Sequence, residues 1–209
     1  MRRDRAYLKH CGQVSLLIGK MYVTLAPCIL SGILNMLWCR TSVCRSCASP
    51  IDRGRKLRDG RRIFGDNKTF AGFFGMIVCG CISQLLWGSL CGISEFLESR
   101  NYVYGSCPNT PAFNLLLGGL TGFAYVLFEL PNSFIKRRLD IPSGKTVSGI
   151  KGAVFFAVDQ IDSLLGVILV ISFFYPMPVW QYWLYILLGA ATHIAVNAVL
   201  YLLKIRKNL

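Results

Sequence analysis

The chain has 209 residues, of which 54% are hydrophobic and 16% are charged, and its mean hydropathy is +0.48. This composition is too apolar for an ordinary soluble domain and favours an integral membrane protein. The formal net charge of +13 could indicate nucleic-acid binding, but the basic segments lack the interleaved aromatic residues of stacking platforms, so we expect no nucleic-acid partner.

Long uncharged segments predict the membrane-spanning helices. They cover residues 21–39, 70–94, 101–128 and 163–203. A hydrocarbon core about 30 Å thick needs about 20 helical residues, so the first three segments can each cross once and the fourth twice. Two prolines and flanking aromatic residues at 175–180 predict a turn that divides the fourth segment. We therefore predict an all-α, five-span membrane protein with one domain, residues 1–209, and a fourth span that begins near Gly152.

The basic start of the chain, MRRDRAYLKH, leads into a full-length span without a small-residue cleavage site, so we expect the first span to be retained. Lysine and arginine predict the orientation. Nine lie in residues 40–68, five in residues 132–151 and three after Leu203, against one between the second and third spans. The positive-inside rule therefore places the basic loops and the C-terminus in the cytoplasm and the N-terminus outside.

The first basic loop contains a glycine-rich stretch, PIDRGRKLRDGRRIFGDNKTFAG, which includes Asp66, Lys68 and Thr69. Glycines permit close backbone approach to phosphates, and Lys-Thr before a helix offers an ammonium, a hydroxyl and backbone amides to an anion. The stretch fits either a polyphosphate cradle or a solvated loop that leads into the second span. The sequence SGKT at 143–146 is not a Walker A loop, because position 139 is leucine where that motif requires glycine.

Two carboxylates, Asp159 and Asp162, follow the second basic loop at the start of the fourth span. Positions three apart share a helix face, so we expect the two side chains to lie together. Magnesium takes one or two protein carboxylates and fills its other positions with water and phosphate oxygens, and nearby Lys and Arg would stabilise a phosphoryl- or nucleotidyl-transfer transition state. The alternative is a structural pair that binds nearby basic residues and compensates the helix dipole.

Three motifs in this order resemble the CDP-archaeol synthase family, relatives of the phosphatidate cytidylyltransferases. They are PIDRGRKLRDGRRIFGDNKTFAG, ELPNSFIKRRLD and VDQID, and the resemblance covers residues 50–166. It implies a five-span enzyme of phospholipid biosynthesis that joins CTP to a lipid phosphate, with Mg²⁺ as cofactor, and releases pyrophosphate. The implied lipid is 2,3-bis-O-geranylgeranylglyceryl phosphate or phosphatidate, and the implied product is the corresponding CDP-lipid.

The resemblance also implies roles for individual residues, because they match the family's D-G-K-T, S-x-x-K-R and D-x-x-D motifs. The implied catalytic cations are Lys68, Lys136 and Arg137. The candidate substrate-binding residues are Asp66, Asn67, Thr69, Ser133, Lys145 and Lys151. The implied metal ligands are Asp159 and Asp162.

The first motif departs from the family pattern D-G-K-T-W-R-G at Asn67, Phe70 and Ala71, so an arginine that could contact phosphate is missing. Lys145 and Lys151 enter the candidate list because they could supply the lost charge. The resemblance therefore indicates the reaction class more firmly than the substrate preference.

Other polar residues have open interpretations. We expect His193 and Asn197, four apart in the last span, to hydrogen-bond between helices, and Glu129 either supports the catalytic lysines or is an interfacial charge. Cys44 and Cys47 form the one C-x-x-C pair, which is too few ligands for a zinc site. A small transporter and a non-catalytic membrane scaffold are alternative functions, and the sequence predicts no oligomeric state.

Overall fold

The computed structural model describes residues 2–145 and 147–202, and this part of the chain contains helices and no β-strand. The helices are α1 (Arg2–Trp38), α2 (Ser42–Ser46), α3 (Phe70–Ile93), α4 (Glu95–Glu98), α5 (Pro111–Arg138), α6 (Gly149–Phe174) and α7 (Val179–Leu202). Among the described residues, five helices are long and apolar enough to cross a membrane: α1 from Gly12 onward, α3, α5, α6 and α7. The predicted all-α, five-span architecture is confirmed, and the single domain stays a prediction.

The bounds predicted for the third span, residues 101–128, are wrong. Residues 101–110 form turns, and α5 begins at Pro111, where Thr110 caps the helix by accepting a hydrogen bond from the Phe113 amide at 3.3 Å. The helix then continues to Arg138. A search for uncharged segments ends a span at its first charge, whereas a helix continues as far as its backbone hydrogen bonds do. The S-x-x-K-R motif therefore lies on a helix and not in a loop.

The first span also begins earlier than predicted, because Lys20 interrupts the uncharged segment but not the helix. The fourth span begins at Gly149, close to the predicted Gly152, and Val179 opens the fifth after the expected turn. The basic tail after Leu203, which we expect in the cytoplasm, lies outside the described residues.

Helices α3 and α5 pack closely through glycines. A Cβ atom on Gly118 would lie 2.4 Å from the carbonyl oxygen of Gly80, and one on Gly122 would lie 2.7 Å from the carbonyl oxygen of Met76. Glycine is therefore required where the two backbones approach. Close approach of this kind allows apolar helices to associate in a bilayer, where lipid and side chain are equally apolar.

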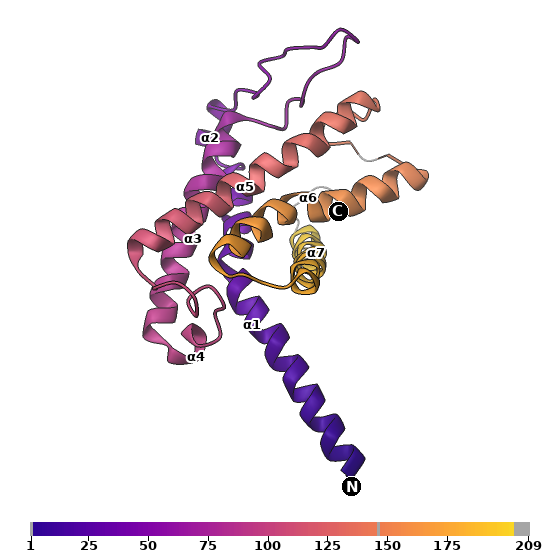
Figure 1. Ribbon diagram of the computed structural model, residues 1–209. Coiled ribbons are helices and arrows are strands. Elements are labelled where there is room, and N and C mark those ends of the chain that lie inside the picture. The colour runs from indigo at the N-terminus through magenta and orange to yellow at the C-terminus, as the bar shows by residue number, and fades with distance from the viewer. Residues whose placement is uncertain (1, 146, 203–209) are drawn as a thin grey trace.

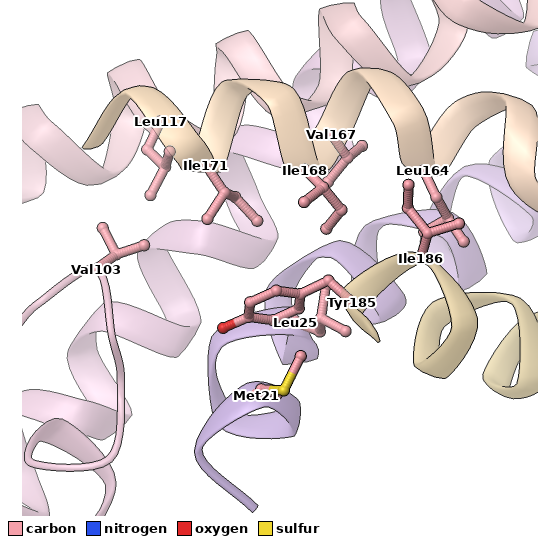
Figure 2. Packing of buried hydrophobic residues seen from close by; sticks show 10 residues of the cluster. All are labelled: Met21, Leu25, Val103, Leu117, Leu164, Val167, Ile168, Ile171, Tyr185 and Ile186. Carbon is pink, nitrogen blue, oxygen red and sulfur yellow. The ribbon is translucent and has the colours of Figure 1, made fainter. Parts of the chain in front are cut away.

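A cluster of buried side chains, here called the apolar core, joins α1, α5, α6, α7 and the α4–α5 connection (Figure 2). Its members are Met21, Leu25, Val103, Leu117, Leu164, Val167, Ile168, Ile171, Tyr185 and Ile186. Its members from α6 lie in the second half of that helix, and those from α5 and α7 lie in the first halves of theirs. The apolar core therefore lies toward the end of the bundle where α5 and α7 begin.

The opposite end, here called the basic end, is where residues 39–69 and 139–148 connect the helices. The longer connection, between α2 and α3, extends from the bundle on the side opposite to the start of α1 (Figure 1). Ion pairs join the two connections, because Arg61 contacts Asp140, and Arg138 at the end of α5 contacts Asp59. These contacts fix the two basic loops side by side.

Candidate active site

A cavity of about 640 Å³ lies at the basic end, among α1, α5, α6, α7 and both connecting loops. Eight of the candidate residues line it: Asn67, Lys68, Ser133, Lys136, Arg137, Lys145, Asp159 and Asp162. Seven of them come from three separate motifs, and Lys145 lies between the second and third motifs. Basic side chains outnumber acidic ones in the lining, so the cavity suits an anionic ligand.

Lys68 reaches the cavity from the residue pair that precedes α3, and its ammonium contacts the carboxylate of Glu129 on α5. Burial alone would lower the pKa of Lys68. The charge and hydrogen bond of Glu129, with weaker contributions from Asp162 and Asp159, outweigh burial and raise that pKa above its ordinary value. Lys68 is therefore held as an ammonium, and Glu129 is the residue that holds it.

Asp159 and Asp162 share one face of α6, as their spacing predicts, and both contact α5. The amide nitrogen Nδ2 of Asn132 donates to Asp159 Oδ1 and to Asp162 Oδ2, each at 2.6 Å. Lys136, one turn further along α5, contacts both carboxylate oxygens of Asp159. The second oxygen of Asp162 accepts a hydrogen bond from the Ser163 amide at 2.7 Å. The two carboxylates therefore converge on the Asn132 amide nitrogen, and each accepts hydrogen bonds from identified donors.

Asp52 organises the loop that delivers residues 64–68 to the cavity. Its side chain is 4% exposed and accepts hydrogen bonds from the backbone amides of Gly54, Phe64 and Gly65 and from the guanidinium of Arg62. Burial by itself would raise the pKa of Asp52, but these donors outweigh it and hold the pKa well below its usual range. The glycine-rich loop is thus fixed by a buried carboxylate and is not a freely solvated turn.

The segment after α5 packs on this loop. Arg137 Nη1 donates to Ser143 Oγ at 2.6 Å. Gly65 has a φ of +96°, and a Cβ atom there would lie 2.1 Å from Ser143 Oγ. Glycine at position 65 is therefore required both by the backbone conformation and by the space that Ser143 fills.

Three candidate residues lie outside the lining of the cavity. Thr69 is the N-cap of α3, and its hydroxyl accepts from the Gly72 amide at 3.1 Å. Asp66 is exposed and pairs with Arg62 at 2.9 Å, and Lys151 is exposed on the first turn of α6. A motif does not distinguish a side chain that contacts substrate from one that caps the adjoining helix.

Sequence reasoning did not select several lining residues, among them Arg40, Asn132, Ser143 and Gln160. Asn132 and Gln160 are both 7% exposed, and each has an amide oxygen without a hydrogen-bond partner among the described residues. Their position in the sequence could have identified them, because uncharged polar residues within an apolar span seldom face lipid. His193 and Asn197 of α7 also line the cavity, and the rings of His193 and Tyr125 lie 6.2 Å apart.

The family described as CarS-like, CDP-archaeol synthase, matches residues 15–208. A solved structure described as an intramembrane enzyme for archaeal membrane lipid biosynthesis has a TM-score of 0.60, with 20% identity, and covers 85% of this chain and 92% of its own. This likeness agrees with the all-helical membrane fold.

Curated relatives named CDP-archaeol synthase are similar in sequence. The one from Pyrococcus abyssi is 44% identical over 104 residues. This match spans about half of each protein, 49% of this chain and 53% of the relative. The one from Pyrobaculum aerophilum is 35% identical over 76% of this chain and 80% of the relative. The one from Archaeoglobus fulgidus is 31% identical over 86% of this chain and 96% of the relative. The chain therefore belongs to the CDP-archaeol synthase family.

Proposed function

We propose that this chain is a membrane cytidylyltransferase that joins CTP to a lipid phosphate and releases pyrophosphate. The observation that carries the proposal is the cavity at the basic end, which gathers three separate motifs and combines cationic side chains with a carboxylate pair. Family membership supports the same reaction. Because the relatives are named for archaeol, we propose an ether-linked isoprenoid lipid phosphate, of the 2,3-bis-O-geranylgeranylglyceryl phosphate type, as the substrate.

We further propose that the basic end faces the cytoplasm, where CTP is available. The lysines and arginines of its two loops support this orientation through the positive-inside rule. A lipid phosphate would then keep its chains in the bilayer while its headgroup enters the cavity between the helices. Both substrates could meet at one membrane face without either crossing it.

The proposed reaction is an in-line displacement. An oxygen of the lipid phosphate forms a bond to the α-phosphorus of CTP, and the bond from that phosphorus to the oxygen bridging the β-phosphate breaks. Lys68, Lys136 and Arg137 neutralise the charge that accumulates on the phosphate oxygens. The lipid phosphate is already ionised near neutral pH, so the reaction needs no strong general base.

The carboxylate pair, Asp159 and Asp162, fits a divalent cation such as Mg²⁺. Its two carboxylates converge on one Asn132 nitrogen, and carboxylate oxygens are hard donors of the type that Mg²⁺ prefers. Within residues 2–145 and 147–202, no three His, Cys, Asp or Glu side chains form a metal-binding group. Two protein carboxylates with water and phosphate oxygens match the usual coordination of Mg²⁺. When bound, this ion would polarise the phosphate oxygens of CTP.

The test compares Asp159→Asn and Asp162→Asn with the unmodified protein at subsaturating magnesium, and measures transfer of labelled cytidylate to lipid. We expect each substitution to lower turnover by about 100-fold or more, since each removes a charge that holds the cation. Glu95→Gln, on the exposed surface of α4 at the other end of the bundle, is the control and should retain full activity. Unchanged turnover in both aspartate variants would refute the assignment.

A further inference from the structure

The side chain of Asn132 joins the two carboxylates of the proposed metal site. It is 7% exposed, lines the cavity, and donates from Nδ2 to both Asp159 and Asp162 at 2.6 Å. An amide nitrogen has two hydrogens, so both are used in these bonds. With both carboxylates ionised, as cation binding requires, the amide must present its nitrogen to them, because an ionised carboxylate accepts hydrogen bonds and cannot donate to the amide oxygen.

We propose that Asn132 is a positioning residue, which sets the separation of Asp159 and Asp162 so that they bind a divalent cation together. This inference rests on the function proposed above. Asn132 would act through the carboxylates and need not contact the reacting atoms. Asn132 lies on α5, whereas both carboxylates lie on α6, so it holds the two carboxylates from a different helix.

The need for such a residue follows from charge. Two like charges on one face of a helix repel each other, and Lys136 contacts Asp159 but not Asp162 in the hydrogen bonds described above. A lysine between the carboxylates would draw them together but would also neutralise them. The neutral amide of Asn132 draws them together without adding a positive charge, so among these contacts only that of Lys136 with Asp159 competes with a cation for their negative charge. Outer residues that hydrogen-bond to ligating carboxylates tune metal affinity in this way.

The remaining oxygen of the same amide supports this interpretation. Oδ1 of Asn132 is buried and has no hydrogen-bond partner among the described residues. A buried asparagine kept for stability alone would be expected to satisfy its acceptor as well as its donors. At the wall of the cavity, this oxygen can accept a hydrogen bond from water bound to the cation.

The experiment measures Mn²⁺ binding to the purified full chain in detergent by electron paramagnetic resonance, without CTP or lipid. We expect Asn132→Ala to weaken Mn²⁺ binding by about 10- to 100-fold, the range for loss of a residue that orients metal ligands. Turnover of the same variant at saturating Mg²⁺ should stay within a few-fold of normal. The concentration of Mg²⁺ giving half-maximal turnover should rise with the Mn²⁺ dissociation constant.

Asn114→Ala is the matched control. Asn114 is also buried on α5 and hydrogen-bonded, to Tyr104 and Asn109 at 2.8 Å, but it lies in the first part of the helix and outside the cavity lining. Its substitution should lower thermal stability and leave Mn²⁺ affinity unchanged. Asn132→Ser, which keeps one donor, should give an intermediate loss and provides the measurement if Asn132→Ala does not fold.

The outcomes separate this inference from the proposed function. If Asp159→Asn abolishes Mn²⁺ binding while the folded Asn132 variants bind as tightly as the unmodified protein, the positioning role is overturned and the metal site stands. If the unmodified protein does not bind Mn²⁺, or Asp159→Asn binds it equally well, the metal site itself fails. Weakened binding in the Asn132 variants, with normal binding in Asn114→Ala, supports the inference.

Discussion

The apolar core and the cavity occupy successive parts of the same helix, and they differ in what holds them together. Asp159 and Asp162 face the cavity from the middle of α6, whereas Leu164, Val167, Ile168 and Ile171, within the next three turns, belong to the apolar core. The core is closed by apolar packing, and the cavity is bounded by ion pairs and hydrogen bonds between polar side chains. Substitutions in the core should therefore change stability, while those in the cavity should change activity.

The largest effect expected from this difference is on turnover. Lys68→Ala should lower the rate of cytidylate transfer by about 100- to 1,000-fold, because it removes one preorganised charge at the transferring phosphate. Its effect on the thermal unfolding temperature should be small, since Glu129 is only partly buried and can be hydrated once its partner is removed. Steady-state kinetics and a thermal scan of one preparation make the measurement. A variant that unfolds early but turns over normally would break the distinction.

The converse prediction concerns the apolar core. Ile168 is 0% exposed, so Ile168→Ala should lower the free energy of unfolding by about 2 kcal/mol. This lies at the lower end of the range for buried aliphatic residues, because the environment outside the bundle is lipid and not water. Below the unfolding temperature, the KM for CTP should not change. A raised KM with unchanged stability would show that the two regions are not separate.

A loss of stability of similar size is expected at Asp52, which belongs to neither region but supports the cavity. Asp52→Asn should cost about 1–3 kcal/mol, because it removes a buried charged acceptor of several hydrogen bonds. The measurement is thermal unfolding in detergent, accompanied by limited proteolysis of residues 52–66. Proteolysis of that loop at the unmodified rate would contradict the account.

The same residue predicts a pH dependence. The folded-state pKa of Asp52 is lowered, so its stabilising contribution is fully present above its unfolded-state pKa of about 3.9 and is lost as the pH falls toward the folded-state value. The unfolding temperature of the unmodified protein should therefore fall below about pH 4 more steeply than that of Asp52→Asn. If the unfolding temperatures of the two proteins fell in parallel with pH, Asp52 would not be the source of the acid sensitivity.

The smallest effects separate two exposed lysines. Lys145 lines the cavity, whereas Lys151 does not. Lys145→Ala should raise the KM for CTP several-fold, and Lys151→Ala should leave it unchanged, because solvent-exposed charges interact weakly beyond their immediate neighbours. Equal effects of the two substitutions, or full CTP affinity in the double variant, would show that Lys145 has no special place in the cavity.

Much of the fold was predictable because length and apolarity determine which segments can cross a bilayer, and Thr110 and Pro111 could have placed the start of α5. The sequence did not show that Lys136 lies on a helix, because a charged helix end and a charged loop have the same composition. For the site, the spacing of Asp159 and Asp162 placed both on one face of α6. Their contact with Asn132, which comes from another helix, depends on how α5 packs against α6, and no local pattern contains it.

The most direct test of the central claim is pyrophosphate release by the purified protein in detergent with CTP and Mg²⁺, in the presence of unsaturated archaetidic acid, phosphatidate or no lipid. The account predicts release that requires CTP and a lipid phosphate together and is faster with the ether-linked lipid. No release with either lipid, from protein shown to be folded and to bind CTP, would contradict the proposed reaction.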